Sequence, residues 1–148
     1  MRTELKAAFG DMVEGIGDRR GGFDMYATLT YRDPPEELQK LGWTRIGGVY
    51  ARRTADQFLR ELGEHVGLHD IHWVRAMEMQ RDRSVPHWHM LIGGCGEVRR
   101  SDLWSYWFER HGFARILPYD RHLGVRFYLC KYVVKELGDI EFSRNLDL

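Results

Sequence analysis

The 148-residue chain has little cysteine, no long apolar run and no net charge. Its two cysteines, Cys95 and Cys130, lie too far apart in sequence for a disulfide framework or a zinc-binding spacing, so we expect a reducing compartment. No apolar stretch approaches the ~20 residues of a membrane span. The N-terminal residues also lack a secretory apolar run. These features predict a cytoplasmic protein without a membrane partner.

The charge balance excludes one class of nucleic-acid binder and leaves another open. Lys and Arg together number 22, as do Asp and Glu, so the formal net charge is zero. A strongly basic coat protein is therefore excluded, whereas a local basic surface is not. Hydrophobic residues make up 43% and charged residues 30%, which is typical of a folded globular chain of one domain.

Residue periodicity predicts an α+β fold, an antiparallel sheet with flanking helices. We expect residues 1–22 to form a helical N-terminal extension, loosely attached through the polar DRRGG segment, and residues 23–148 to form the main domain. In chain order, the expected elements of that domain are a strand at 25–33, a helix at 54–66 capped by Thr54, a hairpin of 71–80 with 87–93, a helix starting at a Ser101 cap and running to 111, a strand at 113–119 and a helix at 121–137.

Two histidines occupy alternate positions of the expected second hairpin strand. His87 and His89 project from one face of that strand, because strand side chains alternate between faces. If the register places Glu78 opposite either histidine, its carboxylate shares their face, and Gln80 is a fallback oxygen ligand. Two imidazoles and a carboxylate suit Mg²⁺ or Mn²⁺ used for Lewis-acid chemistry. The alternative is a pair of ordinary half-buried sheet histidines.

The last expected helix carries two phenols and two ammonium groups on one face. Tyr128, Lys131, Tyr132 and Lys135 stand at positions i, i+3, i+4 and i+7. Tyrosine can serve as a covalent nucleophile, and a neighbouring lysine favours the phenolate and screens charge on a phosphate. The pattern therefore suits attack on a phosphodiester. An exposed polar stripe is the alternative, since tyrosine and lysine readily reach solvent.

Three motifs together resemble HUH endonucleases, in particular the rolling-circle replication initiator (Rep) proteins of phages and small plasmids. ATLTYRD at 27–33 is similar to the family's first-strand motif, PHWHMLI at 86–92 to its histidine motif, and YLCKYVVK at 128–135 to its two-tyrosine helix. FSRNL at 142–146 resembles the segment that often follows. The resemblance spans about residues 25–146 and implies a sheet with an RRM-like core.

The resemblance implies metal-dependent nicking and joining of single-stranded DNA through a 5′-phosphotyrosine. It implies that His87, His89 and Glu78 hold the divalent metal, Mn or Mg. Tyr132, followed three residues later by Lys135, matches the nucleophile of single-tyrosine relatives. Tyr128 matches the second tyrosine and is alternatively a positioning residue.

The DNA partner would have to contact local basic clusters, because the overall charge is zero. The candidates are Arg81 and Arg83 in the hairpin turn and Arg126 near the tyrosines, with Arg99, Arg100 and Arg121 as further basic positions. No Walker motif is present, so unwinding would require a separate helicase. Two other functions stay open: an HUH transposase of one domain, and a nucleic-acid-binding module without catalysis. Trp88 and Tyr31 could stack on bases, but we expect both in the core.

Overall fold

The computed structural model describes residues 2–43, 45–67, 70–80, 85–135 and 140–146. In chain order the elements are α1 (Arg2–Asp18), β1 (Met25–Thr30), α2 (Glu36–Lys40), α3 (Gly48–Val66), β2 (His72–Gln80), β3 (Val85–Gly93), α4 (Arg100–Arg110), β4 (Ala114–Pro118), α5 (Gly124–Lys135) and β5 (Ile140–Phe142). Within these ranges, no helix is both long enough and apolar enough to cross a membrane.

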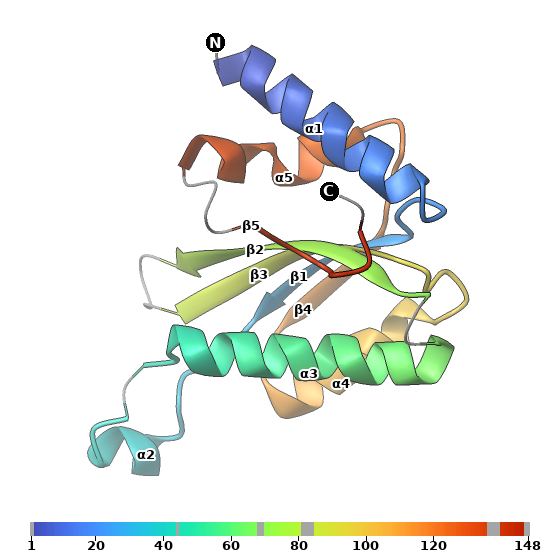
Figure 1. Cartoon of the computed structure of the whole chain (residues 1–148). Coiled ribbons are helices and arrows are strands. Elements are labelled where there is room, and N and C mark those ends of the chain that lie inside the picture. The colour runs from blue at the N-terminus through green and yellow to red at the C-terminus, as the bar shows by residue number, and fades with distance from the viewer. Residues whose placement is uncertain (1, 44, 68–69, 81–84, 136–139, 147–148) are drawn as a thin grey trace.

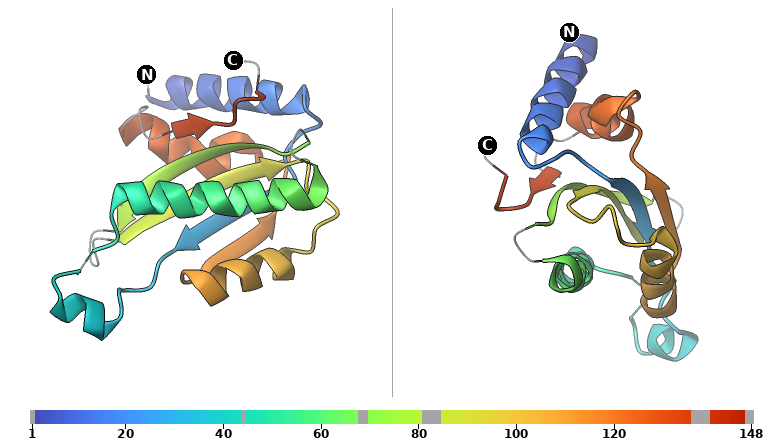
Figure 2. Two further views of the ribbon diagram at one scale, coloured as in Figure 1. Left: turned by 60° about the horizontal axis from the view of Figure 1, so that its bottom comes forward. Right: turned by 90° about the vertical axis from the view of Figure 1, so that its right-hand side faces the viewer.

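The five strands form one sheet in the order β4-β1-β3-β2-β5, and every neighbouring pair is antiparallel. Helices α1 and α5 lie on one side of the sheet, and α3 and α4 lie on the other (Figures 1 and 2). The predicted α+β class, the hairpin and the antiparallel sheet are therefore confirmed.

Alternation along β3 divides its side chains between two cores. Trp88, Met90 and Ile92 enter the core under α3 and α4, whereas Leu91 enters the core under α1 and α5. Successive strand residues face opposite sides of a sheet. His87 and His89 therefore share the face of Leu91, which is the face that α1 and α5 cover.

The N-terminal helix is packed onto the domain and is not loosely attached. Val13 and Ile16 of α1 are buried in the same core as Leu129 of α5. The two helices also approach closely, since a Cβ built on Gly10 would lie 2.9 Å from the Cβ of Arg126. The predicted helical extension is confirmed, and its apolar side completes the core beneath it.

Two predicted helix starts are wrong. Helix α3 begins at Gly48, so Thr54 lies inside it, and its hydroxyl donates to the Tyr50 carbonyl at 3.0 Å in place of capping. A threonine inside a helix commonly satisfies its hydroxyl in this way. Ser101 likewise lies within α4, and Arg99 occupies the N-cap position without a side-chain hydrogen bond.

The last helix begins later than the periodicity predicts, and two short elements were not predicted. Helix α5 starts at Gly124, whose φ of +76° suits a glycine after a turn. The predicted C-terminal end of this helix, residues 136–137, lies outside the described residues. The short helix α2 and the edge strand β5 gave too few residues for a periodic pattern.

Candidate functional site

The register of the β2–β3 hairpin brings a carboxylate to the two histidines. Glu78 pairs directly with His87, and Ala76 pairs with His89. The Oε2 atom of Glu78 lies 3.8 Å from Nε2 of His89. Glu78 and His87 are half-buried, and His89 is buried. The prediction that the register could place Glu78 on the face of both histidines is thus confirmed in its geometry.

The two ring nitrogens of His89 face different partners. Nδ1 lies 2.7 Å from the hydroxyl of Tyr26, which comes from the neighbouring strand β1, whereas Nε2 faces Glu78. A neutral imidazole donates from one nitrogen and accepts at the other. If the Nδ1–H group donates to Tyr26, the lone pair of Nε2 is available to a ligand on the Glu78 side. Burial raises the pKa of Tyr26, so this phenol stays protonated near neutral pH.

Helix α5 places Tyr128 directly over Tyr26. The two ring centroids are 4.7 Å apart, and the Tyr128 side chain is only 9% exposed. Its hydroxyl accepts a hydrogen bond from the backbone N–H of Asp120 at 3.0 Å. Tyr119 packs against the same ring at 5.3 Å. Tyr128 is therefore fixed in the core, and it links α5 through Tyr26 to His89.

The predicted metal ligands supply the right donors, although they are not gathered as a closed cage. Among the described residues, no group of three or more His, Cys, Asp or Glu side chains is arranged to hold a metal ion. The ring centroids of His87 and His89 are 6.3 Å apart. Two imidazoles and one carboxylate on a single face nonetheless form an open donor set that suits Mn²⁺ or a similar ion. The donor chemistry fits a divalent metal.

The other predicted site residues fall into two groups. Arg126 is exposed on α5, on the side beside Gly10 of α1. The second group lies outside the described residues. Lys131, Tyr132 and Lys135 belong to α5, but their side chains are outside that part of the structure, as is the side chain of Gln80; Arg81 and Arg83 lie outside it entirely.

Several further basic and aromatic candidates have structural partners. Arg121 pairs with Asp18 at 2.9 Å, and Arg99 lies 3.2 Å from Asp102. Trp88 and Tyr31 are almost fully buried, and the indole N–H of Trp88 donates to the Tyr31 hydroxyl at 3.1 Å. The expectation that both rings belong to the core is therefore confirmed.

Sequence reasoning missed Tyr26 as a contributor to the site. The tyrosine shares the parity of Thr28 and Thr30 on β1, and these two residues pair with His89 and His87. The alternating pattern of residues 25–30 therefore contained a signal that Tyr26 faces the histidine side. The register between β1 and β3 was also needed, and it is a property of the folded sheet.

Comparison with protein families gives one match. A family model described as replication-associated protein, of the ORF2 type, matches residues 24–137. Comparisons with curated proteins and with solved structures gave no match. The matched range begins just before β1 and extends past α5, so it includes the histidine pair and the tyrosine helix.

Proposed function

The chain belongs to the ORF2-type family of replication-associated proteins, and we propose that it initiates rolling-circle replication by nicking single-stranded DNA with a tyrosine nucleophile. The coarser part, a replication-associated role, follows from the family. The finer part is a metal-dependent nicking and joining reaction of the HUH type, and it is supported by the arrangement of the site.

One observation carries the proposal: the helix with the tyrosines covers the same sheet face as the histidines. Helix α5 extends over the sheet toward the end where β2 stops and β3 starts, which is the end that holds Glu78 and His87 (Figures 1 and 2). Tyr128 and His89 contact the same residue, Tyr26. A nucleophile and an electrophilic site must be close for phosphoryl transfer, and this topology supports such an approach.

In this proposal, His87, His89 and Glu78 hold a divalent ion, Mn²⁺ or Mg²⁺. Bound there, such an ion would supply Lewis-acid polarisation of the scissile phosphate. His89 would bind through Nε2, because its Nδ1 faces Tyr26. Tyr26 would orient the ring, since histidine ligands commonly donate their second N–H to a fixed partner.

We assign the first nucleophile to Tyr132, one helical turn beyond Tyr128 on α5. The phenol oxygen bonds to phosphorus as the bond to the 3′ oxygen breaks; the phenol loses a proton and the 3′ oxygen gains one. The products are a 5′-phosphotyrosine and a free 3′-hydroxyl. A phenol has a pKa of about 10, so the 3′-hydroxyl can later displace it without ATP. Lys131 and Lys135 would stabilise the phenolate and the developing phosphate charge.

The environment of Tyr128 favours a positioning role over the role of a second nucleophile. Its phenol is buried and accepts the Asp120 N–H, so attack would require the ring to leave the core. The partners of the reaction would be single-stranded DNA, contacted in part by Arg81, Arg83 and Arg126, and a separate helicase that unwinds the duplex.

The proposal is tested by trapping the covalent intermediate. Labelled single-stranded oligonucleotides covering replication-origin-like sequences are incubated with the protein and Mn²⁺, and adducts that survive SDS are mapped by mass spectrometry. We expect a fragment attached to Tyr132, no adduct with Tyr132→Phe, and retained adduct with the matched variant Tyr128→Phe. An adduct undiminished by Tyr132→Phe would overturn the assignment of the nucleophile. Absence of cleavage and adduct with the whole panel would overturn the nicking function.

A further inference from the structure

Three aromatic side chains form an exposed row on and after α4. The rings of Trp104 and Phe108 are stacked, with centroids 4.6 Å apart and planes inclined by 10°. Phe113 continues the row at 6.1 Å from Phe108. Trp104 is 40% exposed and Phe113 is 60% exposed. We call Trp104, Phe108 and Phe113 the α4 aromatic stripe.

The stripe is not required to bury α4 on the sheet. Leu103 and Trp107 take that role, since both are buried in the core beneath α3 and α4, and the Trp107 indole donates to the Thr30 carbonyl at 2.7 Å. The stripe occupies another side of the helix and leaves aromatic faces in solvent. A contiguous exposed aromatic surface commonly marks a binding site.

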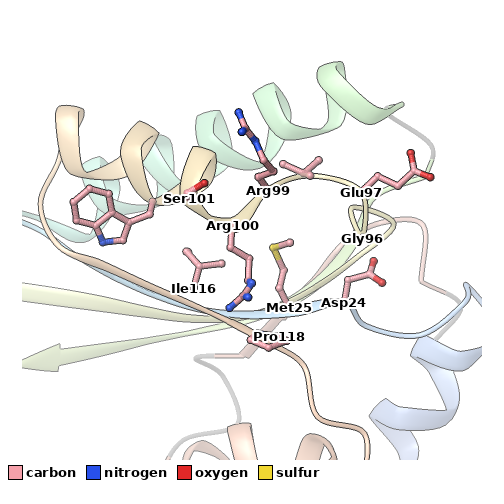
Figure 3. Close-up of a pocket in the computed structure, with 11 residues that line it drawn as sticks. Asp24, Met25, Gly96, Glu97, Arg99, Arg100, Ser101, Ile116 and Pro118 are labelled. Carbon is pink, nitrogen blue, oxygen red and sulfur yellow. The ribbon is translucent and has the colours of Figure 1, made fainter.

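Arginines flank the stripe at both ends. The Arg32 guanidinium lies over the Phe108 ring, 4.8 Å from its centroid, and donates to the Phe108 carbonyl. At the other end, Trp104 and Arg100 line a pocket of about 720 Å³. Figure 3 shows the Arg100 side chain reaching into this pocket between Ile116 and Met25.

Acidic side chains also occur around the pocket, but two of them are engaged by the protein. The Asp24 carboxylate accepts the backbone N–H of Cys95 at 3.0 Å. Asp102 lies next to Arg99 at 3.2 Å, and Figure 3 shows Arg99 pointing away from the pocket floor. Glu97 is exposed at the rim. Arg100 thus presents a cation to a ligand that enters the pocket.

The stripe begins near the proposed nicking site. The backbone N–H of Thr30 donates to the Phe113 carbonyl at 2.8 Å, and Thr30 pairs with His87 across β1 and β3. Phe113 therefore lies at the sheet end that carries His87. From there the stripe follows α4 to the pocket beside Ile116 and Pro118, at the opposite end of β4.

We propose that the α4 aromatic stripe and its pocket bind single-stranded DNA that flanks the nick, an inference that rests on the proposed nicking function. Unpaired bases would stack on Trp104 and Phe113, and Arg32 and Arg100 would contact the phosphates. Duplex DNA does not offer exposed base faces for such stacking. Aromatic rings between two cations match the alternating bases and phosphates of a single strand better than they match an apolar peptide.

The test compares oligonucleotides by length, using the full chain in EDTA so that binding is measured without metal or cleavage. Fluorescence anisotropy is recorded for a short labelled strand and for the same strand extended by about ten nucleotides at either end. We expect one extension to tighten binding at least about fivefold, the smaller effect of removing one base–aromatic stack. The variant Trp104→Ala/Phe113→Ala should lose this gain.

The matched control is Trp43→Ala, which removes another exposed indole, at 67% exposure, between α2 and α3. It should keep the gain from the extension. Thermal unfolding establishes that each variant is folded, and Phe113→Ala alone serves if the double variant is not. An unchanged gain in the stripe variants, or an equal loss in Trp43→Ala, would overturn the proposal.

The two proposals fail in different ways. If the wild-type protein forms no covalent adduct but the stripe variants still lose the gain from extension, the DNA-binding stripe stands and the nicking function is wrong. If the wild-type protein forms the adduct but extension adds no affinity, the nicking function stands and the stripe is wrong. Preference for a duplex of equal length would also contradict the single-strand assignment.

Discussion

Replacing Tyr26 with phenylalanine removes one hydroxyl and keeps the ring that contacts Tyr128. The lost contact is the 2.7 Å hydrogen bond to Nδ1 of His89. The packing of the two aromatic rings, with centroids 4.7 Å apart, is retained. We therefore expect a loss of only about 0.5–1.5 kcal/mol in the free energy of unfolding, the usual net value of one hydrogen bond.

The effect on the metal should be larger than the effect on stability. Without Tyr26 as an acceptor, the His89 ring loses the contact that fixes its orientation and favours protonation at Nδ1. Loss of such an outer partner typically costs about 10–100-fold in metal affinity, or roughly 1.4–2.7 kcal/mol. Calorimetric titration with Mn²⁺ measures this directly, and NMR of the histidine ring nitrogens reports the tautomer of His89.

Tyr119→Phe is the matched control for Tyr26→Phe. Tyr119 also packs against Tyr128, and its hydroxyl donates to Glu14 of α1 instead of contacting His89. We expect Mn²⁺ affinity close to wild type in this variant. Wild-type Mn²⁺ affinity in Tyr26→Phe, or an equal loss in both variants, would refute the role given to Tyr26.

Two further predictions concern the framework. Gly10→Ala should destabilise the protein by about 1–3 kcal/mol, because the new methyl group would meet the Cβ of Arg126, whereas Gly15→Ala, with open space around it, should stabilise it by about 0.5–1 kcal/mol; chemical denaturation measures both, and equal signs would contradict this packing. Glu141→Gln should cost about 1–2 kcal/mol at pH 7. Although burial acts to raise the pKa of Glu141, its hydrogen bond with Arg75 holds that pKa below 4.5, so the difference from wild type should be constant above the unfolded pKa and shrink as the pH falls through the folded one. A difference that grew on acidification would be evidence against this ion pair.

The distribution of side chains along each segment was sufficient to predict most of the fold. Alternation in β1 and β3 and the helical spacing of α3 and α5 depend on local geometry, which is encoded by neighbouring residues. Helix starts were less predictable, because Thr54 has the composition of a cap but uses its hydroxyl inside α3. The edge strand β5 was missed because three residues have no meaningful period on their own.

The sequence by itself determined which chemical groups are available: two histidines on one strand face, an acid upstream, and two tyrosines one helical turn apart. Only the tertiary structure decided that Glu78 lies opposite His87, that α5 covers this face, and that Tyr26 contacts both His89 and Tyr128. Each of these relations joins segments whose register or docking depends on long-range burial. A local pattern specifies the face of a strand, whereas the packing of the whole sheet specifies what that face meets.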